Sequence, residues 1–144
     1  MTTSSWTIRL PAALDRLPEA MAFVETRAQA AGVQPAKISG LCLALEEAFV
    51  NICSYAFKDD PGEVALTCFE TAAAFILEIA DTGPEFNQLS VPEPDLDLPL
   101  EQRRIGGLGV HFIRKFTDQV DWRREDNMNI LRLSVNLNRE KPPK

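Results

Sequence analysis

The sequence has fewer basic than acidic residues, no long apolar run and few cysteines, and each of these features argues against some classes of function. Its 144 residues carry a net charge of −6, which argues against a nucleic-acid groove because such grooves usually need a basic surface. No apolar run approaches the ~20 residues of a membrane span, and the first residues, MTTSSWTIRL, lack the basic and apolar regions of a secretory signal. We therefore expect a cytoplasmic protein with protein or small-molecule partners and no direct binding to nucleic acid or membrane.

Paired cysteines and two common nucleotide-binding motifs are also missing. Cys42, Cys53 and Cys68 are an odd number, sit among apolar residues and show no CxxC spacing, which favours reduced core thiols over a disulfide or metal site. The chain has no GxxxxGK[ST] loop and no HRD or DFG motif. P-loop proteins and eukaryotic-type kinases are thereby excluded.

What is present is the pattern of one α+β domain. The hydrophobic content of 45% is ample for a single core at this length. Alternating apolar residues predict strands, and apolar residues recurring at three and four predict helices. The predicted strands are residues 6–10, 63–70, 74–81, 119–125 and 129–137, and the predicted helices are residues 14–32, 35–52 and 110–118. We expect residues 1–144 to form a two-layer sandwich, a mixed but mostly antiparallel sheet with helices on one face, followed by a short tail at 139–144.

The segment ALEEAFVNICSYAF, residues 44–57, combines helical apolar spacing with two polar residues on one face. Glu47 and Asn51 are four residues apart, so they lie on the same side of the helix. A carboxylate there can accept a proton, and an amide oxygen can bind a hard cation such as Mg²⁺, which takes only a few protein oxygens. Taken alone, the pair also fits the polar flank of an amphipathic helix.

A second candidate group is the end of the strand AFILEIAD with the following TG. Alternate residues from Phe75 onward face the same way, so Asp81 ends a buried apolar row. A buried carboxylate needs hydrogen-bond donors. The exocyclic amino group of a purine can supply one, and Gly83 lets the backbone approach the base. A solvated turn is the alternative, since Asp and Gly are ordinary turn residues.

A long loop ends in the third candidate group. Residues 84–105 carry four prolines and many acidic residues without a sustained period, which indicates a functional or disordered loop. The loop ends in RRIGGLG, where a helix start with free N–H groups would suit phosphate, and the two arginines would concentrate positive charge. A structural turn before a helix is the alternative. The candidate phosphate-binding residues are Arg103, Arg104, Gly106, Gly107, Leu108 and Gly109.

The order of these groups resembles a known family. A helix bearing ExxxN, a strand ending in DxG, and a long loop ending at a glycine-rich helix start are the pattern of the Bergerat (GHKL) ATP-binding fold. Within that fold, LEEAFVNICSYAF, DTGPEF, RRIGGLGVHFIRKFTD and NILRLSV resemble the anti-sigma factor serine/threonine kinases of bacterial partner-switching systems. The length and the single histidine, His111, favour these small kinases over sensor histidine kinases, gyrase-type topoisomerases and heat-shock chaperones.

The resemblance implies roles for the candidate residues. Glu47 would be the general base and Asn51 the Mg²⁺ ligand. Asp81 would contact the adenine amino group, with Gly83 under the base. Residues 84–109 would form the ATP lid, with their glycines near the phosphates. The cofactors implied are ATP and Mg²⁺, and the implied partners are a STAS-type anti-sigma antagonist as phosphate acceptor, a sigma factor or similar regulator that is sequestered, and a second copy in a homodimer.

Three features differ from the family pattern, and two of them, the acidic, proline-rich lid and a missing Gly-Thr pair, keep a second function open. Tyr55 stands four residues after Asn51, where these kinases often have histidine, and NMNIL at residues 127–131 replaces a common Gly-Thr pair. The alternative function is a nucleotide-binding interaction module that sequesters a partner without transferring phosphate.

Overall fold

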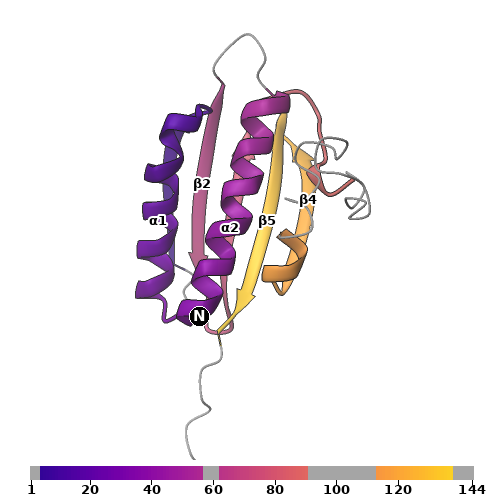
Figure 1. Ribbon diagram of the computed structural model, residues 1–144. Helices are drawn as coiled ribbons and strands as arrows, with labels where there is room; N and C mark the ends of the chain where they lie inside the picture. The colour runs from indigo at the N-terminus through magenta and orange to yellow at the C-terminus, as the bar shows by residue number, and fades with distance from the viewer. Residues whose placement is uncertain (1–3, 57–61, 91–112, 138–144) are drawn as a thin grey trace, which may run out of the picture.

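The computed structural model describes residues 4–56, 62–90 and 113–137, which form one sheet with helices packed against one face (Figure 1). The strands are β1 (Ser4–Pro11), β2 (Glu63–Glu70), β3 (Ala74–Asp81), β4 (Gln119–Glu125) and β5 (Met128–Asn136). Their spatial order is β1-β2-β3-β5-β4. The two-layer α+β sandwich is confirmed. All pairings among the described strands are antiparallel, so the expectation of a mixed sheet is not met there. Two of these pairings, β2 with β3 and β4 with β5, are hairpins.

Strand bounds follow closely from the sequence pattern. The structure gives β2, β3 and β4 the predicted bounds, whereas β5 begins and ends one residue earlier than predicted. The shift arises in the β4–β5 turn. Asp126 and Asn127 both have positive φ, 52° and 60°, which is the geometry of a two-residue hairpin turn. Met128 is therefore the first residue of β5 and not the last residue of the turn.

Two long helices cover the sheet, α1 (Leu17–Ala30), which follows the short 3₁₀ turn η1 (Leu14–Arg16), and α2 (Pro35–Asn51). The predicted end of α1 near Gly32 is confirmed. Gly32 has φ +85° and donates to the Gln29 carbonyl, while Val33 donates to the Ala28 carbonyl. This pair of bonds is a Schellman motif, in which glycine takes the left-handed conformation. None of the helices in the described ranges combines the length and hydropathy needed to cross a bilayer.

The core lies between the helices and the sheet. The inward residues of α2 pack on alternate residues of the central strands, and Leu45, Ala48 and Phe49 are fully buried. Directly after Asn51 the helix widens into the π-helical segment η2 (Ile52–Ala56), a geometry that often marks functional sites. The candidate site residue Asn51 is therefore buried at the point where the regular helix ends.

The three cysteines are free, as predicted. Cys42 and Cys68 are buried in the core and Cys53 is half-buried. Burial raises the pKa of all three thiols, and that of Cys68 reaches about 12. These thiols carry little thiolate at neutral pH, so they behave as small apolar side chains.

A short helical turn at residues 113–116 packs on α2 at a glycine. A Cβ atom on Gly40 would lie 2.8 Å from the Cβ of Phe116, so only glycine allows this approach. The fully buried Ile113 of the same turn belongs to the core. Of the helix predicted at 110–118, the structure describes residues 113–118 and shows 113–116 as helical. Asp118 leaves the helix because its backbone N–H donates to the Ser134 carbonyl.

Gly40→Ala should lower the free energy of unfolding by about 1 kcal/mol. Overpacking against Phe116 costs about 1 to 3 kcal/mol, and the better helix propensity of alanine offsets up to about 1 kcal/mol of this. The matched control is Ser39→Ala, an exposed position on the same helix, which should leave stability unchanged or raise it. Urea unfolding of both variants measures the difference. Equal stabilisation by both alanines would show that the 113–116 turn does not need this glycine.

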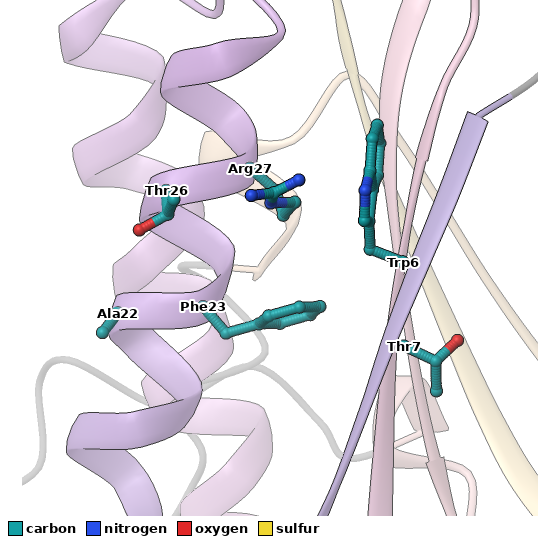
Figure 2. A pocket seen from close by; sticks show the side chains of 6 residues that line it. All are labelled: Trp6, Thr7, Ala22, Phe23, Thr26 and Arg27. Atoms are coloured by element: carbon teal, nitrogen blue, oxygen red, sulfur yellow. The ribbon is translucent and has the colours of Figure 1, made fainter.

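A pocket of about 440 Å³ lies between β1 and α1 (Figure 2). Trp6 and Phe23 line it, and the guanidinium of Arg27 lies 4.9 Å from the centre of the Trp6 ring. This cation–π contact helps to hold α1 on the edge strand. The pocket contains none of the predicted site residues, and β2 separates β1 from the strand that carries Asp81. This pocket therefore lies apart from the candidate site.

Candidate functional site

The strand β3 ends in a buried carboxylate, as the alternation predicts. Asp81 is 3% exposed and pairs with Asn129 of β5 across the sheet. Its Oδ1 accepts hydrogen bonds from the Gly83 backbone N–H at 2.9 Å and from Asn129 Nδ2 at 3.0 Å. Both bonds from the described residues end on one oxygen. The other oxygen, Oδ2, is therefore the one available to a donor on a ligand.

The electrostatic surroundings of Asp81 favour such a donor. Burial raises the pKa of the Asp81 carboxyl, while the hydrogen bonds from Asn129 and Gly83 and the positive charge of Arg124 act in the opposite direction. Arg124 also donates from Nη1 to the Gly83 carbonyl at 2.8 Å, which fixes the turn after β3. A buried carboxylate is stabilised chiefly by hydrogen bonds, so a further N–H donor from a ligand would strengthen the ionised form.

Asn129 is a site residue that the sequence analysis did not single out. It is 4% exposed, and its Nδ2 also donates to the Pro84 carbonyl at 2.8 Å. Its Oδ1 accepts from the Phe86 backbone N–H at 3.0 Å. One side chain thus holds Asp81 and fastens the following turn to β5. The sequence signal for its burial was a polar residue at the start of the alternating row Leu131, Leu133 and Val135, although this pattern does not identify its partner.

Asn129→Ala should lower the free energy of unfolding by about 2 kcal/mol. The change removes the acceptor of the half-buried Phe86 N–H and one of the two donors to the buried Asp81 Oδ1, and losing hydrogen bonds of a buried group costs about 1 to 3 kcal/mol. Asn136→Ala, an exposed asparagine of the same strand, is the matched control and should have little effect. Chemical denaturation compares the two variants. A similar small change in both would remove the proposed importance of the Asn129 hydrogen bonds.

Glu47 lies on α2, one turn before Asn51, and is half-buried. Burial raises the pKa of the Glu47 carboxyl, and the negative charge of Glu46 raises it further. A carboxylate with a raised pKa takes up a proton more readily near neutral pH. The position and chemistry of Glu47 therefore suit a general base.

Asn51 ends α2 and is 2% exposed. Its Nδ2 donates to Oε1 of Gln88 at 3.4 Å, and Gln88 Nε2 donates to the Ala48 carbonyl at 3.4 Å. Gln88, itself 4% exposed, begins the 3₁₀ turn η3 (Gln88–Ser90). The same loop therefore starts at Asp81 and reaches Asn51. Sequence reasoning did not identify Gln88.

The residues at this end of α2 fit a Mg²⁺ ion. Asn51 Oδ1 is buried and has no hydrogen-bond partner among the described residues, although buried polar atoms normally have one. An amide oxygen is a suitable ligand for a hard cation. No group of three or more His, Cys, Asp or Glu side chains gathers in the described ranges. Mg²⁺ keeps several waters and binds few protein oxygens together with substrate phosphates, so one amide oxygen is enough for a protein ligand.

The predicted phosphate side falls outside the described residues. This concerns Arg103, Arg104, Gly106, Gly107, Leu108 and Gly109, and most of the predicted lid at 84–109. The described part of the lid, residues 84–90, is fastened by Asn129 and by the Gln88 contacts. The structure thus brings Asp81 and Gly83 together, and connects them through one loop to Asn51.

Comparison with known proteins agrees with this geometry. The family described as "Histidine kinase-like ATPase domain" matches residues 10–135. Proteins called "Serine-protein kinase RsbW" from Bacillus thuringiensis (strain Al Hakam), Bacillus cereus (strain AH187) and Bacillus anthracis (strain A0248) are each 30% identical over 98 residues. Each match covers 65% of this chain and 61% of the relative, so the chain spans less than two thirds of the relatives' length. The predicted resemblance is confirmed at the level of the family.

Proposed function

Because the chain belongs to the histidine kinase-like ATPase domain family, we propose that it is an ATP-dependent serine/threonine protein kinase and an anti-sigma regulatory factor. It phosphorylates a STAS-type antagonist and sequesters a sigma factor or a similar regulator. The similarity to proteins called serine-protein kinases supports this proposal. The observation that carries it is that one loop connects two buried polar groups, the carboxylate of Asp81 at the end of β3 and the amide oxygen of Asn51 at the end of α2.

The base of the nucleotide is recognised at the end of β3. Asp81 Oδ2 accepts a hydrogen bond from the exocyclic amino group of adenine, while Oδ1 stays bound to Gly83 and Asn129. Gly83 is buried and adds no side chain under the base. Guanine carries an oxygen at the corresponding ring position, so two acceptors would meet at Asp81. The site therefore prefers adenine over guanine.

The phosphates lie toward α2 in this proposal. Asn51 would hold Mg²⁺ through Oδ1, and the ion when bound would neutralise phosphate charge. Residues 106–109 would add backbone N–H donors, and Arg103 and Arg104 would add positive charge. Catalysis then depends mainly on positioning and electrostatics, as in other phosphoryl transfers.

Glu47 acts on the acceptor hydroxyl. Its carboxylate takes the hydroxyl proton while the serine or threonine oxygen forms a bond to the γ-phosphorus. The bond from the γ-phosphorus to the β,γ-bridging oxygen breaks, and ADP leaves with that oxygen. The raised pKa of Glu47 favours this proton transfer near neutral pH.

The partners are tested by capture from the source cell. The full chain is immobilised with Mg-ATP, and bound proteins are identified by mass spectrometry, with the Asp81→Asn protein as a matched bait. The proposal expects a STAS-type protein and a sigma factor or similar regulator, and gel filtration should show a homodimer. Capture of neither partner class, combined with no Mg-ATP binding by calorimetry, would contradict it.

A further inference from the structure

An asparagine is an ambiguous metal ligand because its two ends look alike but behave oppositely. The amide oxygen attracts a cation, whereas the NH₂ group repels it, and half a turn about the Cβ–Cγ bond exchanges them. A site that depends on Asn51 Oδ1 therefore needs a neighbour that fixes the orientation of the amide. A ligand that is already held in its binding orientation avoids the cost of reorienting when the metal binds.

We propose that Gln88 is a positioning residue that fixes the Asn51 amide with its oxygen toward the metal. This inference rests on the proposed function, in which Asn51 binds Mg²⁺. Gln88 contacts Asn51 on one side and the Ala48 carbonyl on the other, at 3.4 Å each. The two contacts form a relay from the backbone of α2 to the metal ligand.

The direction of the relay follows from its backbone end. The Ala48 carbonyl can only accept a hydrogen bond, so Gln88 must direct Nε2 toward it and Oε1 toward Asn51. An acceptor at Oε1 in turn requires the NH₂ group of Asn51 on that side. Reversing either amide would place two acceptors or two donors face to face. Oδ1 of Asn51 is therefore left on the other branch, which is the orientation in which it has no partner among the described residues.

Burial makes a reversed orientation of either amide costly. Asn51 is 2% exposed and Gln88 is 4% exposed, although glutamine is rarely fully buried. Water has little access to satisfy a reversed amide, and an unpaired buried polar group is unfavourable. The relay is therefore the arrangement that satisfies both NH₂ groups.

The turn that carries Gln88 does not depend on the Gln88 side chain. Asn87 Oδ1 accepts from the Leu89 N–H at 2.9 Å, and the Asn87 carbonyl accepts from Ser90 Oγ at 2.6 Å. These bonds hold η3 in place when the Gln88 side chain is changed. A variant at Gln88 can therefore test orientation of Asn51 without removing the turn.

The test compares Gln88→Met with Gln29→Met in the full chain. Methionine keeps the length of the side chain and removes its hydrogen bonds, and Gln29 is an exposed glutamine of α1. Calorimetry measures ATP-analogue affinity with Mg²⁺ and with EDTA, and the ratio is the metal enhancement. Partners that orient a metal ligand typically contribute about 10- to 100-fold to metal affinity. Because both contacts are long, we expect Gln88→Met to lose about tenfold in the enhancement, with EDTA affinity close to wild type. The melting temperature should fall by a few degrees, because the buried NH₂ group of Asn51 loses its acceptor.

Gln88→Glu separates orientation from simple packing. At this buried position the neutral carboxyl form is favoured, so its OH can donate to the Ala48 carbonyl while its other oxygen accepts from Asn51 Nδ2. The metal enhancement should therefore recover most of the loss seen in Gln88→Met. The inference is overturned if Gln88→Met keeps the wild-type enhancement, or if EDTA affinity falls as much as Mg²⁺ affinity, which would indicate a structural role. Failure of the proposed function looks different, because wild type itself would then show no Mg²⁺-dependent nucleotide binding.

Discussion

Replacing Glu47 by glutamine should lower phosphate transfer to the partner by about 10²- to 10⁴-fold, the usual contribution of a general base. Glutamine keeps the shape of the side chain but cannot accept the hydroxyl proton. Glu47 is not needed to hold ground-state nucleotide if Asn51 and the lid do so. Affinity for Mg-ATP and for the partner should therefore stay near wild type, and the loss should appear in kcat.

The matched control is Glu46→Gln. Glu46 is the neighbouring half-buried carboxylate on the same helix, and its removal should change transfer only a few-fold. Single-turnover transfer from labelled ATP, with calorimetry on each variant, distinguishes the two positions. Equal losses in both variants, or loss of nucleotide binding in Glu47→Gln, would remove Glu47 as the base.

Replacing Asp81 by asparagine should weaken ATP binding about 10- to 100-fold, because a desolvated hydrogen bond to a charged group is worth about 1 to 3 kcal/mol. The new amide oxygen can still accept from Gly83 and Asn129. Its NH₂ group would then face the adenine amino group, donor against donor. The same NH₂ group can donate to the guanine oxygen, so the preference for ATP over GTP should narrow.

The Asp81→Asn variant should be at least as stable to unfolding as wild type, although its affinity for ATP falls. Burial raises the pKa of Asp81, so its ionised form is less favourable in the folded protein than in the unfolded chain. Stability from this group is present below the unfolded pKa and is lost as pH rises through the folded pKa. At pH 7 the asparagine variant should therefore melt at the same or a higher temperature than wild type.

Asp121→Asn is the control for Asp81→Asn, because Asp121 is an exposed aspartate of β4. Calorimetry with ATP and GTP, together with thermal melts at pH 7, measures both effects. Unchanged nucleotide affinity in Asp81→Asn would take Asp81 out of the base site. A marked fall in melting temperature would mean that its hydrogen bonds hold the fold and that the affinity loss is indirect.

Local patterns predicted most of the fold. The alternation in residues 63–70, 74–81 and 119–125 predicted the first and last residues of three strands correctly, because each run is bounded by turn residues. The placement of Asp81 at the end of a buried row followed from the same alternation. The start of β5 was missed by one residue because the sequence did not show that Asn127 adopts positive φ.

The contacts that complete the candidate site were beyond sequence reasoning. Asn129 meets Asp81 only in the register of β3 with β5, and nothing local specifies that register. Gln88 reaches Asn51 across a separation of 37 residues, from a segment with no apolar period. Both are buried polar residues whose roles depend on the groups that they contact. Periodicity identifies a buried position, whereas a hydrogen-bond partner is identified only by the folded chain.

The most direct measurement of the central claim is transfer of the γ-phosphate itself. The captured partner is incubated with the wild-type chain and labelled Mg-ATP, and its modified residues are mapped by mass spectrometry. The account predicts phosphate on a serine or threonine of the STAS-type partner, formed by wild type and largely lost with Glu47→Gln. Tight binding of ATP and partner by wild type, with the partner unmodified over hours, would contradict it and would leave a nucleotide-binding module that sequesters its partner.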